Sequence, residues 1–299
     1  MNSASGAGNI TFSSTIGDAE NAGVAGTTAI GNAATNDLNF NSTIYSFNGA
    51  TTITAKSGDT IDLGAGAATQ FLTSNDNITF ATGNISIANG SNLTVDTGAE
   101  GGNITIGEID GASQETVTLD AGTGTTSVGV IGSGTEIGVL TIGSSDNGGI
   151  TLNGAITTDG AVTIDGPVTL ATGAVSVTTA NDAITFNHSI DGTQSLTLES
   201  GSAAIILDGA IGADAILTGL SVNATGGSTG TIQITDIGDD AGVGVNTGTV
   251  SIGNVNTATL TLDGTIYKTD VAQTYTAATG QNIDITAAAT FTTTNDAIA

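Results

Sequence analysis

One three-residue pattern constrains this chain more than any other feature: an apolar residue, a Thr or Ser, and a second apolar residue, flanked by Gly, Asn, Asp and Ser. Such an alternation has a period of two, which indicates β-strands with both apolar side chains on one face and the hydroxyl on the other. The flanking residues favour turns and positive φ. The pattern occurs as Ile10-Thr11-Phe12, Ile78-Thr79-Phe80, Ile85-Ser86-Ile87, Leu93-Thr94-Val95, Ile104-Thr105-Ile106, Val117-Thr118-Leu119, Leu140-Thr141-Ile142, Ile150-Thr151-Leu152, Val162-Thr163-Ile164, Val168-Thr169-Leu170, Val175-Ser176-Val177, Ile184-Thr185-Phe186, Leu196-Thr197-Leu198, Val250-Ser251-Ile252 and Leu260-Thr261-Leu262.

Strands this short are not stable alone, so each one needs a neighbour directly above and below. A parallel β-helix supplies these neighbours, because each coil pairs with the next at a spacing of roughly 4.8 Å. Aromatic residues make up only 3% of the chain, so the core volume must come from Ile, Val, Leu and Ala, which suit thin, regularly stacked cores. We therefore expect an all-β chain folded as a parallel β-helix, or β-solenoid, with about 20–25 residues per coil.

A longer repeat, of about 110 residues, overlies the short one. Segments that begin at Leu38, Ile150 and Leu260 resemble one another, and Tyr45 and Tyr267 correspond two periods apart. We expect one continuous solenoid over residues 1–299, with a partial copy at 1–37, full copies at 38–149 and 150–259, and a partial copy at 260–299. Further matching motifs are Ile30-Gly31, Ile142-Gly143 and Ile252-Gly253; Ile16-Gly17-Asp18 and Ile237-Gly238-Asp239; and Asn75-Asp76-Asn77-Ile78, Asn181-Asp182-Ala183-Ile184 and Asn295-Asp296-Ala297-Ile298.

The copies begin and end out of phase with the chain. We expect the chain to be either a window on a longer array or a subunit whose ends join others, since open solenoid ends expose unpaired strand edges. A period of this length also fits tandem immunoglobulin-like or cadherin-like β-sandwiches. Against them stand the absence of Trp, a single Pro and strands too short for a sandwich. A solenoid also explains why the shorter unit is reused within one period, at residues 184–190 and 205–211.

The charge balance excludes several partners. The chain has 2 Lys and Arg against 28 Asp and Glu, a net charge of −26, so nucleic acid and anionic membranes are not expected to bind. It contains no Cys, which excludes a disulfide framework, and no apolar run long enough to span a bilayer, so no membrane insertion is expected. Residues 1–20 lack the pattern of a signal peptide; if the parent protein is exported, we expect the signal to lie upstream.

Two phrases carry a family resemblance. Residues 184–198 and 272–280 resemble the repeat regions of filamentous-haemagglutinin-like and autotransporter-like giant bacterial surface adhesins, and the likeness of style extends over most of residues 9–299. The resemblance implies a right-handed β-helix displayed outside the cell, at the cell surface, in adhesion, matrix or sheath formation. It carries no receptor-binding residue over to this chain.

The first functional expectation is therefore a structural or adhesive segment of a secreted surface or fibre protein, a rigid rod whose length follows the number of repeats. One alternative is a homopolymeric filament or sheath subunit. Self-association, end to end or side by side, and contacts with host or neighbouring cell surfaces or glycans are the partners expected. A second alternative is a polysaccharide-active enzyme on the same fold, with Asp110, Asp191 and Asp208 as candidate paired carboxylates.

Catalysis has little support in the sequence. His188 is the only His, and a lone His on a strand-like unit is more often a surface side chain than a catalytic one. With no Cys, no G-x-S-x-G elbow in a strand–turn–helix context and no phosphate-binding loop, we expect no enzyme and no required cofactor. Carboxylates at repeated positions are more simply explained as a solvated face.

Calcium is the one metal that the sequence suggests, since Ca²⁺ takes oxygen ligands from acidic loops. Asp236, Asp239 and Asp240 lie close together, and Asp18 and Glu20 stand near the corresponding place one double repeat earlier. These five residues are the candidate calcium ligands. The competing interpretation is that both loops are acidic without holding an ion, because the Gly-Gly-x-Gly-x-Asp nonapeptide of calcium-binding β-rolls is absent.

Overall fold

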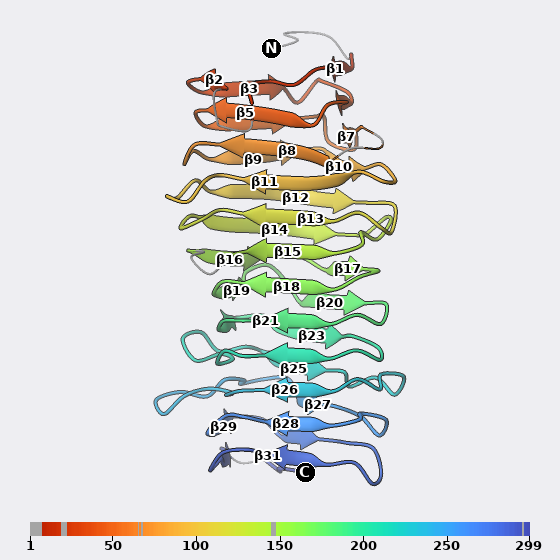
Figure 1. The fold of residues 1–299 in the computed structure, drawn as a ribbon. Coiled ribbons are helices and arrows are strands. Elements are labelled where there is room, and N and C mark those ends of the chain that lie inside the picture. Colours follow the sequence, from red (N-terminus) through yellow and green to blue (C-terminus); the bar gives the residue numbers. More distant parts are fainter. Residues whose placement is uncertain (1–7, 19–22, 65, 67, 145–147, 295) are drawn as a thin grey trace. The chain divides into compact units, whose positions relative to one another are not determined.

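The computed structural model of the chain describes residues 8–18, 23–64, 66, 68–144, 148–294 and 296–299. All regular secondary structure in these residues is β, and parallel strands stack into a right-handed β-helix of about 11 turns in all (Figure 1). The predicted β-helix is confirmed, and the parallel pairing excludes antiparallel sandwiches over the described residues. The chain divides into two compact units, Met1–Ile150 and Thr151–Ala299, so one continuous solenoid over the whole chain stays a prediction.

The first unit has three faces, which the chain visits in the same order in every coil. Face one holds β2, β5, β8, β11, β13 and β15, and face two holds β3, β6 and β9 with the first halves of β12 and β14. Face three holds β1, β4, β7 and β10 with the second halves of β12 and β14 (Figure 1). The strands of this unit are β1 (Ile10–Phe12), β2 (Val24–Ala25), β3 (Thr28–Gly31), β4 (Leu38–Phe40), β5 (Ile44–Asn48), β6 (Thr51–Thr54), β7 (Thr60–Leu63), β8 (Ala68–Thr73), β9 (Ile78–Thr82), β10 (Asn84–Ile87), β11 (Asn92–Asp96), β12 (Ile104–Asp110), β13 (Val117–Asp120), β14 (Thr125–Ile131) and β15 (Leu140–Gly143).

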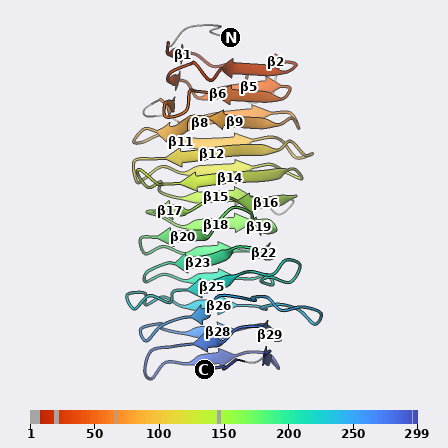
Figure 2. The ribbon, with the colours of Figure 1, turned by 180° about the vertical axis from the view of Figure 1, so that it is seen from behind.

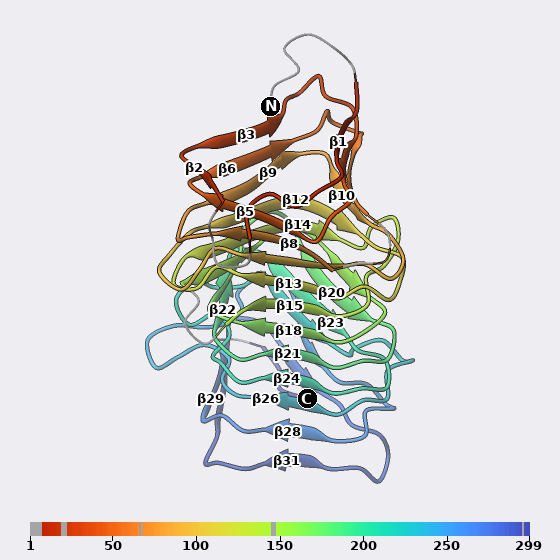
Figure 3. The ribbon, with the colours of Figure 1, turned by 45° about the horizontal axis from the view of Figure 1, so that its top comes forward.

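The second unit is also three-faced (Figures 2 and 3). Its face one is the ladder β18-β21-β24-β26-β28-β31. Its face two runs from β19 and β22 through bridges at Ile211 and Ile237 to β29 and β32. Its face three is the ladder β17-β20-β23-β25-β27-β30. β16 (Gly149–Leu152) spans the boundary of the two units. The remaining strands are β17 (Ile156–Thr158), β18 (Val162–Asp165), β19 (Val168–Leu170), β20 (Val175–Thr179), β21 (Ile184–Phe186), β22 (Ile190–Gly192), β23 (Ser195–Glu199), β24 (Ile205–Leu207), β25 (Gly219–Val222), β26 (Ile232–Ile234), β27 (Val250–Ile252), β28 (Leu260–Leu262), β29 (Ile266–Thr269), β30 (Gln273–Tyr275), β31 (Ile283–Ile285) and β32 (Thr290–Thr293).

Like residues stack on like along each face. In face one of the second unit, Ile184 pairs with Ile205 and Ile205 with Ile232, and all three side chains are buried. Every predicted apolar–Thr/Ser–apolar unit lies in a strand. Each buried aliphatic side chain therefore contacts its counterparts in the coils before and after it, and the core is a set of continuous ladders rather than a globule.

Coil length varies more than the sequence indicates. One short coil runs from Ile184 to its register partner Ile205, whereas a much longer one runs from Leu220 to its partner Val250. The additional residues lie in loops between the strands, which leave the paired registers unchanged.

The long repeat does not contain a whole number of coils. In the first unit, the matching Ile30-Gly31 and Ile142-Gly143 pairs end β3 on face two and β15 on face one. The step from β3 to β15 is twelve strands, and β12 and β14 each cover two faces, so the step is 14 faces. In the second unit, the Thr179 and Thr293 hydroxyls both donate to the carbonyl of the Asp three residues later, at 2.5 Å, after β20 on face three and β32 on face two. Twelve strands and the two bridges again give 14 faces. Since 14 is not a multiple of three, equivalent residues lie on different faces in successive copies.

Local structure follows the repeat closely. The Tyr45 hydroxyl accepts a hydrogen bond from Ser42 N at 2.9 Å and donates one to Phe12 O at 3.3 Å. The Tyr267 hydroxyl makes the same pair of bonds, with Gly264 N at 3.0 Å and Ile234 O at 3.1 Å. Residues 32–35 and 254–257 likewise form the same Asn-x-x-Thr turn, in which the Thr hydroxyl accepts from the Asn backbone N–H. Tyr45 and Tyr267, two periods apart, therefore correspond in structure as well as in sequence.

Candidate functional site

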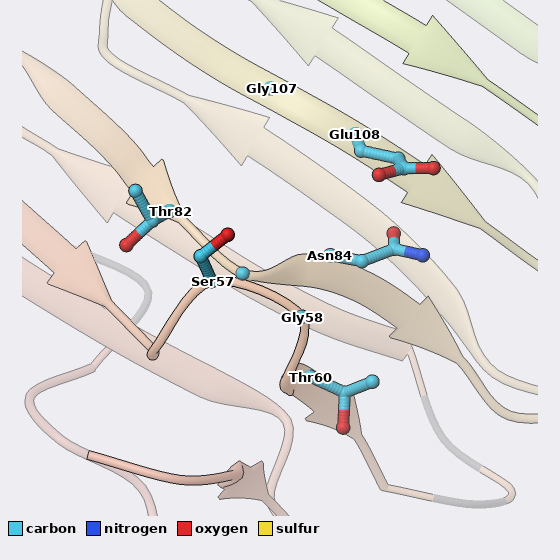
Figure 4. A pocket seen from close by; sticks show the side chains of 8 residues that line it. Ser57, Gly58, Thr60, Thr82, Asn84, Gly107 and Glu108 are labelled. Carbon is cyan, nitrogen blue, oxygen red and sulfur yellow. The ribbon is translucent and has the colours of Figure 1, made fainter. Parts of the chain in front are cut away.

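A shallow groove of about 480 Å³ lies on the first unit where the chain passes from face two to face three (Figure 4). Three glycines line it, together with side chains that carry hydroxyl, amide and carboxylate groups. The residues that line it are Ser57, Gly58, Thr60, Thr82, Gly83, Asn84, Gly107 and Glu108. The groove is thus polar and acidic, which suits hydroxyl-bearing ligands better than anions.

Hydrogen bonds between coils hold these walls. Asn84 Nδ2 donates to Asp110 Oδ2 at 2.6 Å, and the Ser133 hydroxyl donates to Glu108 Oε1 at 2.6 Å. Asn84 Oδ1 is buried and has no hydrogen-bond partner among the described residues. The carboxylates near the groove therefore serve first to tie one coil to the next, which is a structural use.

Two further carboxylates lie at neighbouring strands of face three: Asp37 directly precedes β4, and Asp62 lies on β7. Asp37 Oδ1 accepts the Thr60 hydroxyl at 3.3 Å, and Asp37 Oδ2 accepts Asn9 Nδ2 at 3.1 Å. Burial raises the pKa of Asp62, the Thr60 hydrogen bond lowers it, and the nearby Asp37 charge raises it further. Because the Asp37 carboxylate already accepts hydrogen bonds from Thr60 and Asn9, the pair resembles a packed polar ladder more than an acid–base couple.

Two of the three carboxylates considered for glycan hydrolysis lie on different faces of the second unit. Asp191 lies on β22 in face two, where its Oδ1 accepts Asp214 N at 2.9 Å and Ala215 N at 3.1 Å. Asp208 follows β24 in face one of the same unit, and Asp110 belongs to the first unit. His188 Nε2 lies 3.2 Å from Asp165 Oδ1, with both side chains partly exposed.

The calcium candidates are only partly described. Glu20 lies outside the described residues, and Asp18 lies at the start of its loop. Asp236 Oδ1 accepts Thr265 N at 2.7 Å and Ile266 N at 2.8 Å, so it ties this loop to the following coil. Asp239 Oδ1 folds its own loop by accepting Ala241 N at 2.9 Å and Gly242 N at 2.5 Å.

Lys268 is the cation of this region, and its Nζ donates to the backbone carbonyl of Asp240 at 3.1 Å. Over the described part of the chain, no group of three or more His, Asp or Glu side chains is arranged to hold a metal. Calcium binding at Asp236, Asp239 and Asp240 stays a prediction.

A different surface is the edge of the second unit formed by β30, β31 and β32. Ile283 and Ile285 of β31 are 43% and 53% exposed, although they pair in register with the buried Leu260 and Leu262 of β28. Ile298, bridged to Gln273, is 46% exposed. Core-register side chains are thus uncovered at this edge.

Comparison with known proteins adds no relative: no family model, no curated protein and no solved structure matches the chain. In the described residues there is also no helix of the length and apolarity needed to cross a bilayer. The fold and its surfaces are therefore the basis for any proposal of function.

Proposed function

We propose that this chain is a structural or adhesive segment of a bacterial cell-surface or extracellular fibre protein, and that its stacked strands form a stiff rod. One observation carries the proposal: in both units the short strands pair in parallel and in register, coil upon coil, over a continuous apolar core. In such an architecture each coil is stabilised by its nearest neighbours, so length can grow by adding coils without a larger core.

The outward residues support this role. The central outward position of face three in the second unit is occupied by Ser176, Thr197, Ser221, Ser251 and Thr274 in successive coils. Together with the net charge of −26, such a polar surface keeps a long exported protein soluble. It also offers hydroxyl and carboxylate groups to partners such as cell-surface glycans.

Electron micrographs of the purified chain provide the main test. We expect thin, smooth particles that look the same with and without a chelator. A row of separate beads would contradict the proposal.

Binding and turnover assays on glycans separate adhesion from catalysis. We expect retention of the labelled chain on some cell surfaces or glycan arrays and no release of sugar from acidic polysaccharides. Sustained sugar release, abolished by Asp110→Asn but not by Asp165→Asn, would instead support an enzyme.

A further inference from the structure

Gly107 is a glycine that the local fold does not require. It lies within β12, its φ is outside the left-handed range, and a Cβ added to it would have no atom within 4 Å. Gly129 of the next coil is different, because its added Cβ would meet Gly107 O at 1.9 Å. A glycine inside a strand weakens the strand and often marks a place where another molecule approaches closely. Gly107 lines the groove of the first unit (Figure 4), so the open space beside it is available to a ligand.

The polar side chains of this groove have unused hydrogen-bond acceptors. Asn84 of β10 and Glu108 of β12 lie side by side, because the residues that follow them pair in register (Figure 4). Within the described residues, Glu108 accepts the Ser133 hydroxyl at Oε1 alone, and Asn84 Oδ1 has no partner. Carboxylate and amide oxygens accept hydrogen bonds and cannot donate them, so a bound molecule has to bring O–H or N–H groups.

The same lining excludes other classes of ligand. Its residues are Ser, Thr, Gly, Asn and Glu, with no cation to bind an anion and no apolar side chain to hold a lipid. The Glu108 carboxylate and the net charge of −26 also repel anionic molecules. The lining comes from three successive coils, which are spaced roughly 4.8 Å apart. An extended, hydroxyl-rich and uncharged molecule satisfies all of these conditions.

We propose that the groove of the first unit binds an uncharged glycan chain, with Gly107 beside the sugar and with Asn84 and Glu108 accepting hydrogen bonds from its hydroxyl groups. This inference rests on the proposed adhesive role, and it names the ligand class and the residues that bind it. The groove is shallow, so one site binds weakly, and many sites on one surface bind together more strongly.

Retention of the full chain on immobilised polysaccharides tests the ligand class. The uncharged probes are a β-glucan, a mannan and a galactan, and the charged probes are a polyuronate and the cationic chitosan. We expect retention on at least one uncharged probe and none on the polyuronate, and we expect salt to leave this retention unchanged because the ligand carries no charge to screen. Retention on chitosan alone, lost in high salt, would overturn the inference, and so would the absence of retention on every uncharged probe.

Filling the space beside Gly107 tests the place of binding. G107T adds a strand-favouring side chain where no atom lies within 4 Å, so circular dichroism and urea unfolding should be unchanged. We expect retention on the uncharged probe to fall by about tenfold or more, since the added side chain occupies space that the sugar needs. G226T is the matched control: Gly226, in a loop of the second unit, also has no atom within 4 Å of an added Cβ, and its replacement should leave retention unchanged.

E108Q tests the acceptor. It keeps the size of the side chain and replaces a charged acceptor by a neutral one, which should weaken retention by about fivefold. E100Q, at an exposed position of the same unit, is its control and should bind like the unaltered chain. If G107T and E108Q are both retained as well as the unaltered chain, the groove is not the site and the inference is wrong; smooth particles in micrographs would then leave the structural role standing.

Discussion

Replacing Tyr267 by Phe removes one hydroxyl and two buried hydrogen bonds, and keeps the ring. The ring stacks on Phe291 with centroids 4.8 Å apart, and Phe preserves that contact. The losses are the bonds from Gly264 N and to Ile234 O, at 3.0 and 3.1 Å. At about 0.5–1.5 kcal/mol net for each bond, Y267F should lower the free energy of unfolding by about 1–3 kcal/mol.

Y45F is the matched variant in the first unit. Its two bonds are 2.9 and 3.3 Å long, so we expect a loss of the same size or slightly smaller. Y275F is the control, because the Tyr275 hydroxyl donates to the side chain of Gln273 rather than to a backbone carbonyl. Urea unfolding followed by circular dichroism measures all three. If Y45F and Y267F cost no more than Y275F, the idea that the repeat preserves a structural clamp is wrong.

Three further outcomes follow from the structure. Burial raises the pKa of Tyr267 from 10.0 to about 12. As pH rises from 10 to 12, this tyrosine loses its proton in the unfolded chain before it does so in the folded chain, so the free energy of unfolding should fall. Urea titrations across this range should show a smaller fall for Y267F. Gly253 has φ of +74°, and an added Cβ would meet Thr276 O at 2.1 Å, so G253A should cost more than about 1 kcal/mol in the same assay. Because Asp239 already accepts two backbone N–H groups, removing Ca²⁺ with a chelator should leave the melting temperature unchanged; a large drop that D239N and D240N reproduce would place calcium there.

The strands were predictable because apolar and polar residues alternate with a period of two within most of them. Ile184-Thr185-Phe186 could be assigned to a strand with its Thr outward from the alternation alone, and the structure confirms this. Which strand lies on which was harder, since nearly all carry the same pattern. The register depends on loop lengths, and a long coil such as that from Leu220 to Val250 hides its true neighbour.

The surfaces were the least predictable part. Ile283-Asp284-Ile285 and Ile61-Asp62-Leu63 read alike, so nothing in the residues says that one pair of apolar side chains is covered and the other is not. The acidic candidates show the opposite difficulty. In the sequence, Asp236 and Asp239 suggest calcium ligands because they are acidic and close together. In the structure their carboxylates accept hydrogen bonds from backbone N–H groups and so hold loops, and this role depends on three-dimensional contacts.

Because a period of 14 faces is not a whole number of three-faced coils, the number of copies determines the direction in which a given face points. Duplicating one copy would displace whatever follows along the axis and also swing it by a third of a revolution, because 14 faces are four full coils and two faces more. A surface feature present once in each copy would therefore point in three different directions in three consecutive copies. In the fourth copy it would point in the same direction as in the first. Evolution could thus redirect a distal binding feature by gaining or losing a single copy, with no substitution in the feature itself.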